Sequence, residues 1–521
     1  MDAWGGEDLS SCGSLHSPCK TLRMGVEQVG ANGTVYINGT QSVNSTINID
    51  KNIAIHGLNG ASIIIPLLSS HYEKVFHVFK VVSQVDARFM FLNLPLMALK
   101  ITSSSSITIL NSTFIGARRG ETPTSSKGSP SIYIPSVYQS RIMVSITLKG
   151  VIFTNTDNPL YVGRPAVLSA LSIIDSSFNN TGEITAYDCG KATLTRTNFH
   201  KVGRIEIKVI ESATIRHCQF VATESLNLLE AWVSGRRFPE AEAFISNSQF
   251  RKIPQGIAIS GFNYTTIFKC VVASCLEFEF KTSSVALQAN HIIVDELFCD
   301  HNEAVGGGCM ALRQFNFLYL KNSVFKENKA KKNGGALIID CNGKGNAYEV
   351  ISEIKNCSFV ANEASKGGAI YISTNKNNFN RRDVDILVTN SEFTGNSASA
   401  KGGWGGCLSA DGNRDRSSEI IRFYNCTFSN NSANSFGGVM ALSEISLLVI
   451  SSAIKNNRAS FGGSGVDISS ESNVSMTISK SSFIQNKPPA INAAVARNNL
   501  EDTVLRKIAP SGYPYTNITD P

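Results

Sequence analysis

The stretch Asn356–Ile370, NCSFVANEASKGGAI, decides the fold because near copies of it recur through the second half of the sequence. Each copy has a phenylalanine, an asparagine three residues later, an alanine and then a pair of glycines. The phenylalanines are Phe325, Phe359, Phe393 and Phe428, spaced 34, 34 and 35 residues apart. A fixed period of this length predicts a solenoid, a propeller or an array.

The residues within one copy favour a parallel β-helix. An alternating apolar run such as Ile386–Thr389 leads into the phenylalanine, and a second short apolar run follows the glycines. No helical stripe lies between them, which excludes helical and leucine-rich repeats. A propeller blade needs four strands, whereas this unit supplies two or three. One copy is therefore predicted to be one coil of a parallel β-helix.

The repeated residues have structural roles in this prediction. Each phenylalanine and the small residue two places before it face the core, and the phenylalanines of successive coils stack. The asparagine is expected to bond the asparagine of the next coil, and the glycine pair, with Gly368 in it, to supply positive φ at a corner. In the Asn396 copy the pair is assigned to Gly402 and Gly403. The structural residues are Phe325, Asn328, Phe359, Asn362, Gly367, Gly368, Phe393, Asn396, Phe428 and Asn431.

The first half of the chain repeats the same strand ending with fewer matching letters, as in Asn111–Phe114 and Asn247–Phe250. Roughly 13–16 coils are expected in total. Ser17-Pro18 followed by Leu22 and Val26 predicts a short capping helix. The expected regions are an N-terminal cap over 1–33, degenerate coils over 34–293, regular coils over 294–487 and a C-terminal cap with a tail or linker over 488–521.

Composition excludes several functional classes. The net charge is only +7 and no run of Lys and Arg exceeds two residues, so nucleic acid is not an expected partner. The sequence contains no stretch of about 18 apolar residues, so no membrane span is predicted. Residues Met1–Ser10 lack the features of a secretion signal, so we expect a mature fragment or an incomplete reading frame of an extracellular or cell-surface protein.

Cysteine and asparagine patterns add further expectations. Cys12 and Cys19 are a candidate disulfide, whereas Cys357 and Cys426 lie two coils apart and are expected to be buried thiols. No cysteine or histidine spacing of zinc type occurs, so no metal or other cofactor is expected. Glycosylation is permitted at eleven Asn-x-Ser/Thr sites: Asn32, Asn38, Asn44, Asn111, Asn179, Asn263, Asn356, Asn425, Asn430, Asn473 and Asn517.

With its Phe-x-x-Asn and Gly-Gly-Ala repeats, the chain resembles the polymorphic outer membrane protein repeat family. Phe359–Asn362 with Gly367–Ile370 is the clearest copy, and the specific signal covers about residues 294–487. The resemblance implies an all-β, pectin-lyase-like right-handed parallel β-helix. It also implies a surface role, because bacterial members of that family are surface-displayed adhesins and similar repeats occur in eukaryotic surface proteins.

Acidic residues and long connections are the candidates for chemistry. Asp383, Asp385, Asp411 and Asp415 are expected on loops of adjacent coils and are the weak candidates for catalysis of polysaccharide cleavage. Their alternative interpretation is a solvated loop neutralised by Arg414 and Arg416. Long connections at 342–348, 374–382 and 411–418 are expected to form a binding shelf, with Trp404 exposed nearby. The candidate binding residues are Tyr348, Lys376, Phe379, Arg381, Arg382 and Trp404.

Three functions remain open from the sequence. The first is a non-catalytic surface or adhesion module, a monomeric rod that binds a glycan or a surface protein through loops on one edge. The second is a polysaccharide lyase or glycoside hydrolase, which this fold also supports. The third is a passive structural stalk.

Overall fold

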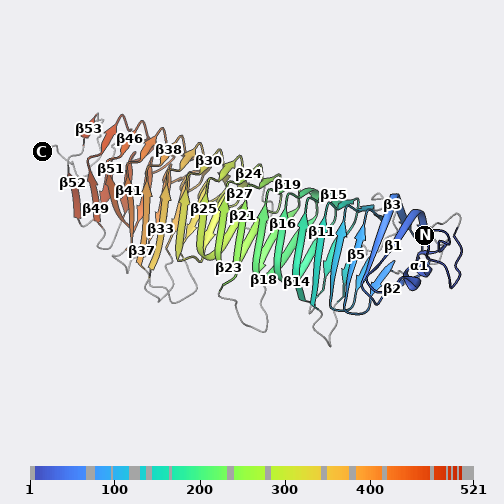
Figure 1. Cartoon of the computed structure of the whole chain (residues 1–521). Coiled ribbons are helices and arrows are strands. Elements are labelled where there is room, and N and C mark those ends of the chain that lie inside the picture. The colour runs from blue at the N-terminus through green and yellow to red at the C-terminus, as the bar shows by residue number, and fades with distance from the viewer. Residues whose placement is uncertain are drawn as a thin grey trace. The chain divides into compact units, whose positions relative to one another are not determined.

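A computed structural model describes residues 6–65, 77–95, 98–115, 130–135, 143–163, 167–230, 240–275, 283–341, 349–374, 383–412, 419–469, 475–487, 491–494, 497–501 and 504–506. The chain divides into two compact units, residues 1–244 (unit 1) and 245–521 (unit 2). In each unit the strands pair in parallel with the strands of the next coil. Each unit is therefore built of coils of a right-handed parallel β-helix, as the sequence predicts. The strands stack side by side along each unit (Figure 1). They alternate buried and exposed residues because one face lines the core.

Unit 1 has three sheets. The first contains β1 (Gly33–Ser42), β3 (Ile53–Ile64), β5 (Val85–Met90), β8 (Ser105–Leu110), β11 (Met143–Lys149), β14 (Val167–Ile174), β16 (Ile184–Thr195) and β18 (Arg204–Arg216). The second contains β2 (Ile47–Ile49), β4 (Phe79–Val81), β7 (Leu99–Ile101), β10 (Ile132–Ile134), β13 (Leu160–Val162), the first residues of β16 and β18, and β20 (Ser225–Glu230). The third contains β6 (Asn93–Leu94), β9 (Thr113–Ile115), β12 (Ile152–Thr154), β15 (Ser177–Thr181), β17 (Asn198–Val202) and β19 (Gln219–Val221). Strand β21 (Glu242–Ser246) contains the division between the units.

Unit 2 repeats the three sheets. The first contains β23 (Ile257–Phe268), β25 (Val285–Asp295), β29 (Phe317–Lys321), β33 (Glu349–Lys355), β37 (Asp383–Thr389), β41 (Ile420–Tyr424), β45 (Ser446–Ile450), β49 (Ser475–Ser479) and β52 (Arg497–Glu501). The second contains β28 (Met310–Arg313), β32 (Leu337–Asp340), β36 (Ile370–Ser373), β40 (Leu408–Asp411), β44 (Met440–Ser443), β48 (Val466–Ser469) and β51 (Ile491–Ala494). The third contains β22 (Gln249–Arg251), β24 (Val271–Ala273), β26 (Phe298–Asp300), β30 (Val324–Lys326), β34 (Ser358–Val360), β38 (Glu392–Thr394), β42 (Thr427–Ser429), β46 (Ala453–Lys455), β50 (Ser482–Ile484) and β53 (Val504–Arg506).

A separate sheet of two-residue strands occurs among the described residues of unit 2. It contains β27 (Glu303–Ala304), β31 (Lys329–Ala330), β35 (Glu363–Ala364), β39 (Ser397–Ala398), β43 (Ser432–Ala433) and β47 (Arg458–Ala459). The alanine of every pair is buried. These strands fill the chain between the repeat's asparagine and its glycine pair, which explains why the repeat keeps a small residue there.

Phenylalanine stacks run through both units. Phe325, Phe359, Phe393 and Phe428 are fully buried, with successive ring centroids 4.8 to 5.0 Å apart. Phe114, Phe153, Phe178, Phe199 and Phe220 stack in unit 1 at 4.4 to 5.0 Å. These spacings match the separation of paired strands, so the stacks follow from one phenylalanine per coil. The predicted core role of the repeat phenylalanines is confirmed.

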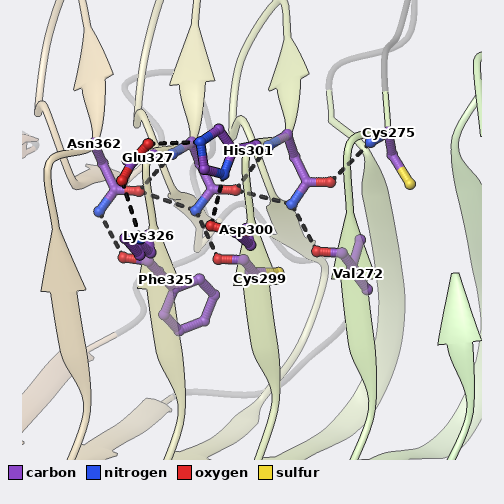
Figure 2. Close-up of polar contacts among 11 residues, drawn as sticks. Val272, Cys275, Cys299, Asp300, His301, Phe325, Lys326, Glu327 and Asn362 are labelled. Carbon is purple, nitrogen blue, oxygen red and sulfur yellow. Dashed lines mark hydrogen bonds and ion pairs between the residues drawn. The ribbon is translucent and has the colours of Figure 1, made fainter. Parts of the chain in front are cut away.

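The asparagine ladder of unit 2 is also confirmed. Nδ2 of Asn362 donates to Oδ1 of Asn396 at 3.0 Å and to the carbonyl oxygen of Phe325 at 2.9 Å. Its Oδ1 accepts from Nδ2 and from the backbone N–H of Asn328, both at 3.0 Å (Figure 2). The same bonds link Asn302, Asn328, Asn362, Asn396, Asn431, Asn457 and Asn486. Asn362 thus has the donors and the acceptor of its buried amide satisfied.

The two glycines of the pair have different roles, which the sequence-based prediction did not distinguish. Gly367 has a φ of +62°, whereas Gly368 does not have a positive φ. A Cβ on Gly368 would lie 2.1 Å from the carbonyl oxygen of Gly406 in the next coil. The expectation of positive φ at Gly368 was wrong. The first glycine turns the chain, and the second lets two backbones approach closely.

The N-terminal cap has the predicted helix. Helix α1 (Leu22–Gln28) starts after Thr21, whose Oγ1 accepts from the backbone N–H of Met24, and it lies against β1 and β2 (Figure 1). The Sγ atoms of Cys12 and Cys19 are bonded at 2.04 Å, as predicted. Within the part of the chain that the structure describes, no helix has the length and apolar character needed to cross a bilayer.

The other cysteines are buried. Cys357 and Cys426 are free thiols, as predicted, and each Sγ faces a backbone carbonyl oxygen. Burial raises the pKa of Cys357 to about 12 and that of Cys426 to about 11. A second disulfide, which the sequence did not indicate, joins Cys299 and Cys309.

Candidate functional site

The corner before β40 contains an insertion that the repeat pattern misplaces. The backbone N–H groups of Gly367 and Gly368 donate to the carbonyl oxygens of Trp404 and Gly405. Gly405 has a φ of +67°, and a Cβ on Gly406 would lie 2.2 Å from the next coil's backbone. The pair equivalent to Gly367-Gly368 is therefore Gly405-Gly406. The assignment of Gly402 and Gly403 to that pair was wrong, because these two residues belong to the inserted turn.

Trp404 occupies the position just before this glycine pair. It forms a parallel β-bridge with Lys366, the residue before the pair in the preceding coil. The indole is 39% exposed, and Nζ of Lys366 lies over the ring, 5.3 Å from its centroid. This cation–π contact holds one face of the indole at the surface and positions a positive charge beside it.

Asp411 and Tyr371 extend this arrangement onto the outer face of the second sheet. Nζ of Lys366 is 3.7 Å from Oδ2 of Asp411, and Oη of Tyr371 donates to the same oxygen at 2.7 Å. Asp411 pairs with Ser373 and Tyr371 with Ser409, so the phenol reaches across one coil to the carboxylate. Lys366, Tyr371, Trp404 and Asp411 are called the Trp404 cluster below.

The protonation state of Tyr371 follows from its surroundings. Burial raises the pKa of the phenol far above its ordinary value, and the hydrogen bond and charge of Asp411 raise it further. Tyr371 is therefore a hydrogen-bond donor and a poor base. The Trp404 cluster offers an aromatic face, an ammonium, a carboxylate and a phenol at one surface, which suits the binding of a polar ligand with an apolar face.

Two further aromatic residues continue the surface beyond Trp404. The backbone N–H of Gly405 donates to the carbonyl oxygen of Phe436 at 3.0 Å, so Phe436 takes the position of Trp404 in the next coil. Its ring centroid lies 5.7 Å from that of Phe461, which is 65% exposed. The sequence-based prediction missed both phenylalanines. Phe436 could have been found from its place directly before Gly437-Gly438, whereas Phe461 lies one residue earlier in its coil, because Gly462 is the residue that pairs with Phe436.

The candidate acids are arranged differently from the expectation. Asp383 and Asp385 lie in β37 and Asp411 ends β40, so the prediction that they lie on loops was wrong. Oδ2 of Asp385 is 3.1 Å from Nη2 of Arg422, while Asp411 contacts Lys366 and Tyr371. Asp385 and Asp411 therefore have different partners, and no contact between described residues joins Asp383 or Asp385 to Asp411. Asp415 lies outside the described residues.

Most of the predicted shelf is not described by the structure. Tyr348, Lys376, Phe379, Arg381 and Arg382 all lie outside the described residues. Trp404 alone among the candidate binding residues has a defined place. The binding role of the shelf therefore stays a prediction. In the Trp404 cluster, Trp404 was a predicted binding residue and Asp411 a predicted acid, whereas Lys366 and Tyr371 were not predicted.

Nine of the eleven glycosylation candidates are described, and all nine are exposed except the half-buried Asn263. Asn356 and Asn425 have positive φ, a conformation that asparagine tolerates better than most residues. Their Nδ2 atoms donate to Asn322 and Asn390 of the preceding coils. Asn473 and Asn517 lie outside the described residues, and glycosylation stays a prediction at every site.

A charged cluster lies beside the asparagine ladder (Figure 2). The His301 ring nitrogens are 2.8 Å from Oδ1 of Asp300 and 2.6 Å from Oε2 of Glu327, and Nζ of Lys326 is 3.1 Å from Oε1 of Glu327. The bond to Lys326 lowers the pKa of Glu327. These groups contact one another at the ends of β26 and β30, and surface pairs of this kind contribute little to stability. Among the described residues, no three or more histidines, cysteines or acids lie close enough together to hold a metal ion.

Comparisons with known proteins do not assign the chain to a family. No protein-family model matches the chain, and no curated protein shows significant similarity to it. Among solved structures, the A-module of the mannuronan C-5 epimerase AlgE6 from Azotobacter vinelandii matches at 9% identity over 93% of each chain, with a TM-score of 0.23. A similarity this weak carries no argument about function. The assignment of the β-helix depends on the strand pairings described above.

Proposed function

We propose that the chain is a non-catalytic extracellular surface module that binds a glycan through the Trp404 cluster. The observation that carries this proposal is the exposed indole of Trp404 with the Lys366–Asp411–Tyr371 contacts beside it. A sugar ring has an apolar C–H face that packs on an indole and hydroxyl groups that bond charged and phenolic side chains. A site with an apolar platform and a few placed polar groups serves both needs.

Two further features support a surface role. The Cys12–Cys19 disulfide favours an oxidising compartment outside the cytosol. The Phe-x-x-Asn and Gly-Gly-Ala repeats are similar to those of the polymorphic outer membrane protein family, whose bacterial members are adhesins. Membership of that family and extracellular location are parts of the proposal.

A polysaccharide-cleaving enzyme is the second candidate, and one observation favours it. Asp411, Tyr371 and Lys366 bring a carboxylate, a phenol and an ammonium into contact on one sheet face. Against it, the raised pKa of Tyr371 makes the phenol a poor base, and Asp385 is paired with Arg422. A binding role needs only hydrogen bonding and charge from these groups, whereas catalysis also needs a group that can accept a proton.

A glycan array probed with the full chain tests the proposal, followed by titration of the best hit. Trp404→Ala should weaken binding at least about tenfold with an unchanged melting temperature. Tyr319→Ala is the matched control, because Tyr319 is an exposed aromatic residue of unit 2 on a different sheet. Equal losses from both variants, or no saturable hit on the array, would refute the glycan-binding role.

The same protein should be incubated with the glycans it binds and the products measured. The proposal expects saturable binding without cleavage. Cleavage that Asp411→Asn abolishes while binding persists would establish the enzyme instead.

A further inference from the structure

The second sheet of unit 1 presents one outward side chain per coil over its first five strands. Strands β2, β4, β7, β10 and β13 have three residues each, with the outer two buried and the middle one facing out. The strand register places these middle residues in one line. They are Asn48, Lys80, Lys100, Tyr133 and Tyr161, called the Lys80 row below.

The aromatic part of the row is ordered by stacking. The ring centroids of Tyr133 and Tyr161 are 5.9 Å apart, and Tyr161 is 38% exposed. Nζ of Lys100 lies 5.7 Å from the Tyr133 centroid, and the His77 ring stacks on Tyr133 at 5.6 Å. The lysine is thus held at the edge of an aromatic platform.

His77 adds a buried polar atom beside the row. Its Nε2 is buried and has no hydrogen bond to any described residue. Burial, with the charge of Lys100 as the second cause, lowers the pKa of His77 to about 4. The imidazole is therefore neutral at physiological pH, and both charges of the row come from lysine.

The row has positive charge without local compensation. No described carboxylate forms an ion pair with Lys80 or Lys100. The line continues through Thr185 to Glu206, the first acid along it, and Glu206 already pairs with Arg204 and Lys208 at 3.4 and 3.3 Å. A ligand that meets the row thus encounters, on adjacent coils, two ammonium groups that no described carboxylate pairs, and then two tyrosine rings.

We infer that the Lys80 row binds an acidic glycan chain, with carboxylate or sulfate groups on Lys80 and Lys100 and sugar rings against Tyr133 and Tyr161. Adjacent coils lie about 4.8 Å apart, so the row repeats its contacts along one direction, as a polymer of sugar units does. Nucleic acid is disfavoured because its binding depends on many phosphate contacts, and the row has two cations. This site is separate from the Trp404 cluster and does not depend on the function proposed there.

The test compares two ligands that differ in charge alone. A β-1,4-linked oligoglucuronate and a cello-oligosaccharide of equal length differ by a carboxylate in place of each CH2OH group. Titrated calorimetrically into the full chain at low salt, the oligoglucuronate should bind more tightly, and added NaCl should weaken that binding because screening shortens the reach of the lysine charges.

The variants locate the binding. Lys80→Gln and Lys100→Gln, made singly, should each weaken oligoglucuronate binding, and together they should weaken it at least about tenfold. Lys201→Gln, the same single charge change on β17 of the third sheet, and Trp404→Ala should leave it unchanged. Tyr161→Ala should weaken it without removing the salt dependence. Equal binding of the two sugars, an equal loss in Lys201→Gln, loss in Trp404→Ala, or tighter binding of a single-stranded oligonucleotide of equal charge would each overturn the inference.

Discussion

The corner three residues after the stacked phenylalanine differs between the two units. In unit 2 this position is Asn328, Asn362, Asn396 and Asn431, whose amides bond from coil to coil. In unit 1 it is Thr156, Thr181, Val202 and Thr223, all buried, and the three hydroxyls have no hydrogen-bond partner among the described residues. Both units nevertheless stack their phenylalanines at the same spacing. Unit 1 therefore keeps the coil register without the asparagine ladder, through its backbone pairings and its phenylalanine stack.

The two units also differ in where their candidate binding residues lie. In unit 2 the Trp404 cluster combines Tyr371 and Asp411, which lie on regular strands, with Trp404, which follows an inserted turn. In unit 1 the candidate site uses the single outward position of short strands, with no insertion needed. Both candidate sites thus use outward residues of the second sheet, and an inserted turn accompanies the one in unit 2.

The largest effect is expected at the glycine pair of the unit 2 repeat. Gly368→Val should destabilise unit 2 by about 4 kcal/mol or more, because its Cβ would lie 2.1 Å from the Gly406 carbonyl oxygen. Gly395→Ala is the control: its φ is +67°, yet the nearest atom to a new Cβ is 4.0 Å away. It should cost about 1–2 kcal/mol. Thermal unfolding measures both, and a Gly368→Val protein that melts like the control would remove the close-approach explanation.

The phenylalanine stack should matter equally in both units. Phe153→Ala in unit 1 and Phe359→Ala in unit 2 should each cost about 3–5 kcal/mol, because both rings are fully buried between neighbouring rings. Denaturant unfolding with one variant at a time compares them. A much larger loss of unfolding free energy in Phe153→Ala than in Phe359→Ala would contradict this. It would mean that the asparagine ladder of unit 2 also holds the coils in register.

The corner residues themselves should respond in opposite ways. Asn396→Ala should lose about 1–3 kcal/mol, because its neighbours lose buried hydrogen-bond partners on both sides. Thr223→Val should be neutral or stabilising by about 1 kcal/mol, since it removes a buried hydroxyl that no described residue bonds. Chemical unfolding curves give both values, and a clear loss in Thr223→Val would mean that its hydroxyl has a partner.

The sequence predicted what repeats and missed what does not. The period, the buried phenylalanines and the asparagine bonds follow from letters that recur from coil to coil. The roles of Gly367 and Gly368 could not be separated, because both are glycine and only the backbone of the next coil distinguishes them. Phe461 was missed because it lies one residue before the position that Phe436 and Trp404 share, so no single repeat position predicts all three. Lys80 and Tyr133 were missed because a three-residue strand has only one outward residue, which gives no alternating sequence pattern.

The smallest expected effect is a pH dependence confined to unit 1. Burial lowers the pKa of His77 from 6.5 to about 4, so the unfolded chain takes up this proton at a higher pH than the folded chain. Stability should therefore fall as the pH drops from 6.5 towards 4, and His77→Gln should remove that part of the fall. The half-buried position makes the effect modest. His200→Gln, at an exposed histidine on β17 of the third sheet, is the control. Melting temperatures of the three proteins between pH 7 and 4 give the answer: if His77→Gln follows the unmodified chain throughout, the imidazole is solvated and the Lys80 row is more open than its geometry indicates.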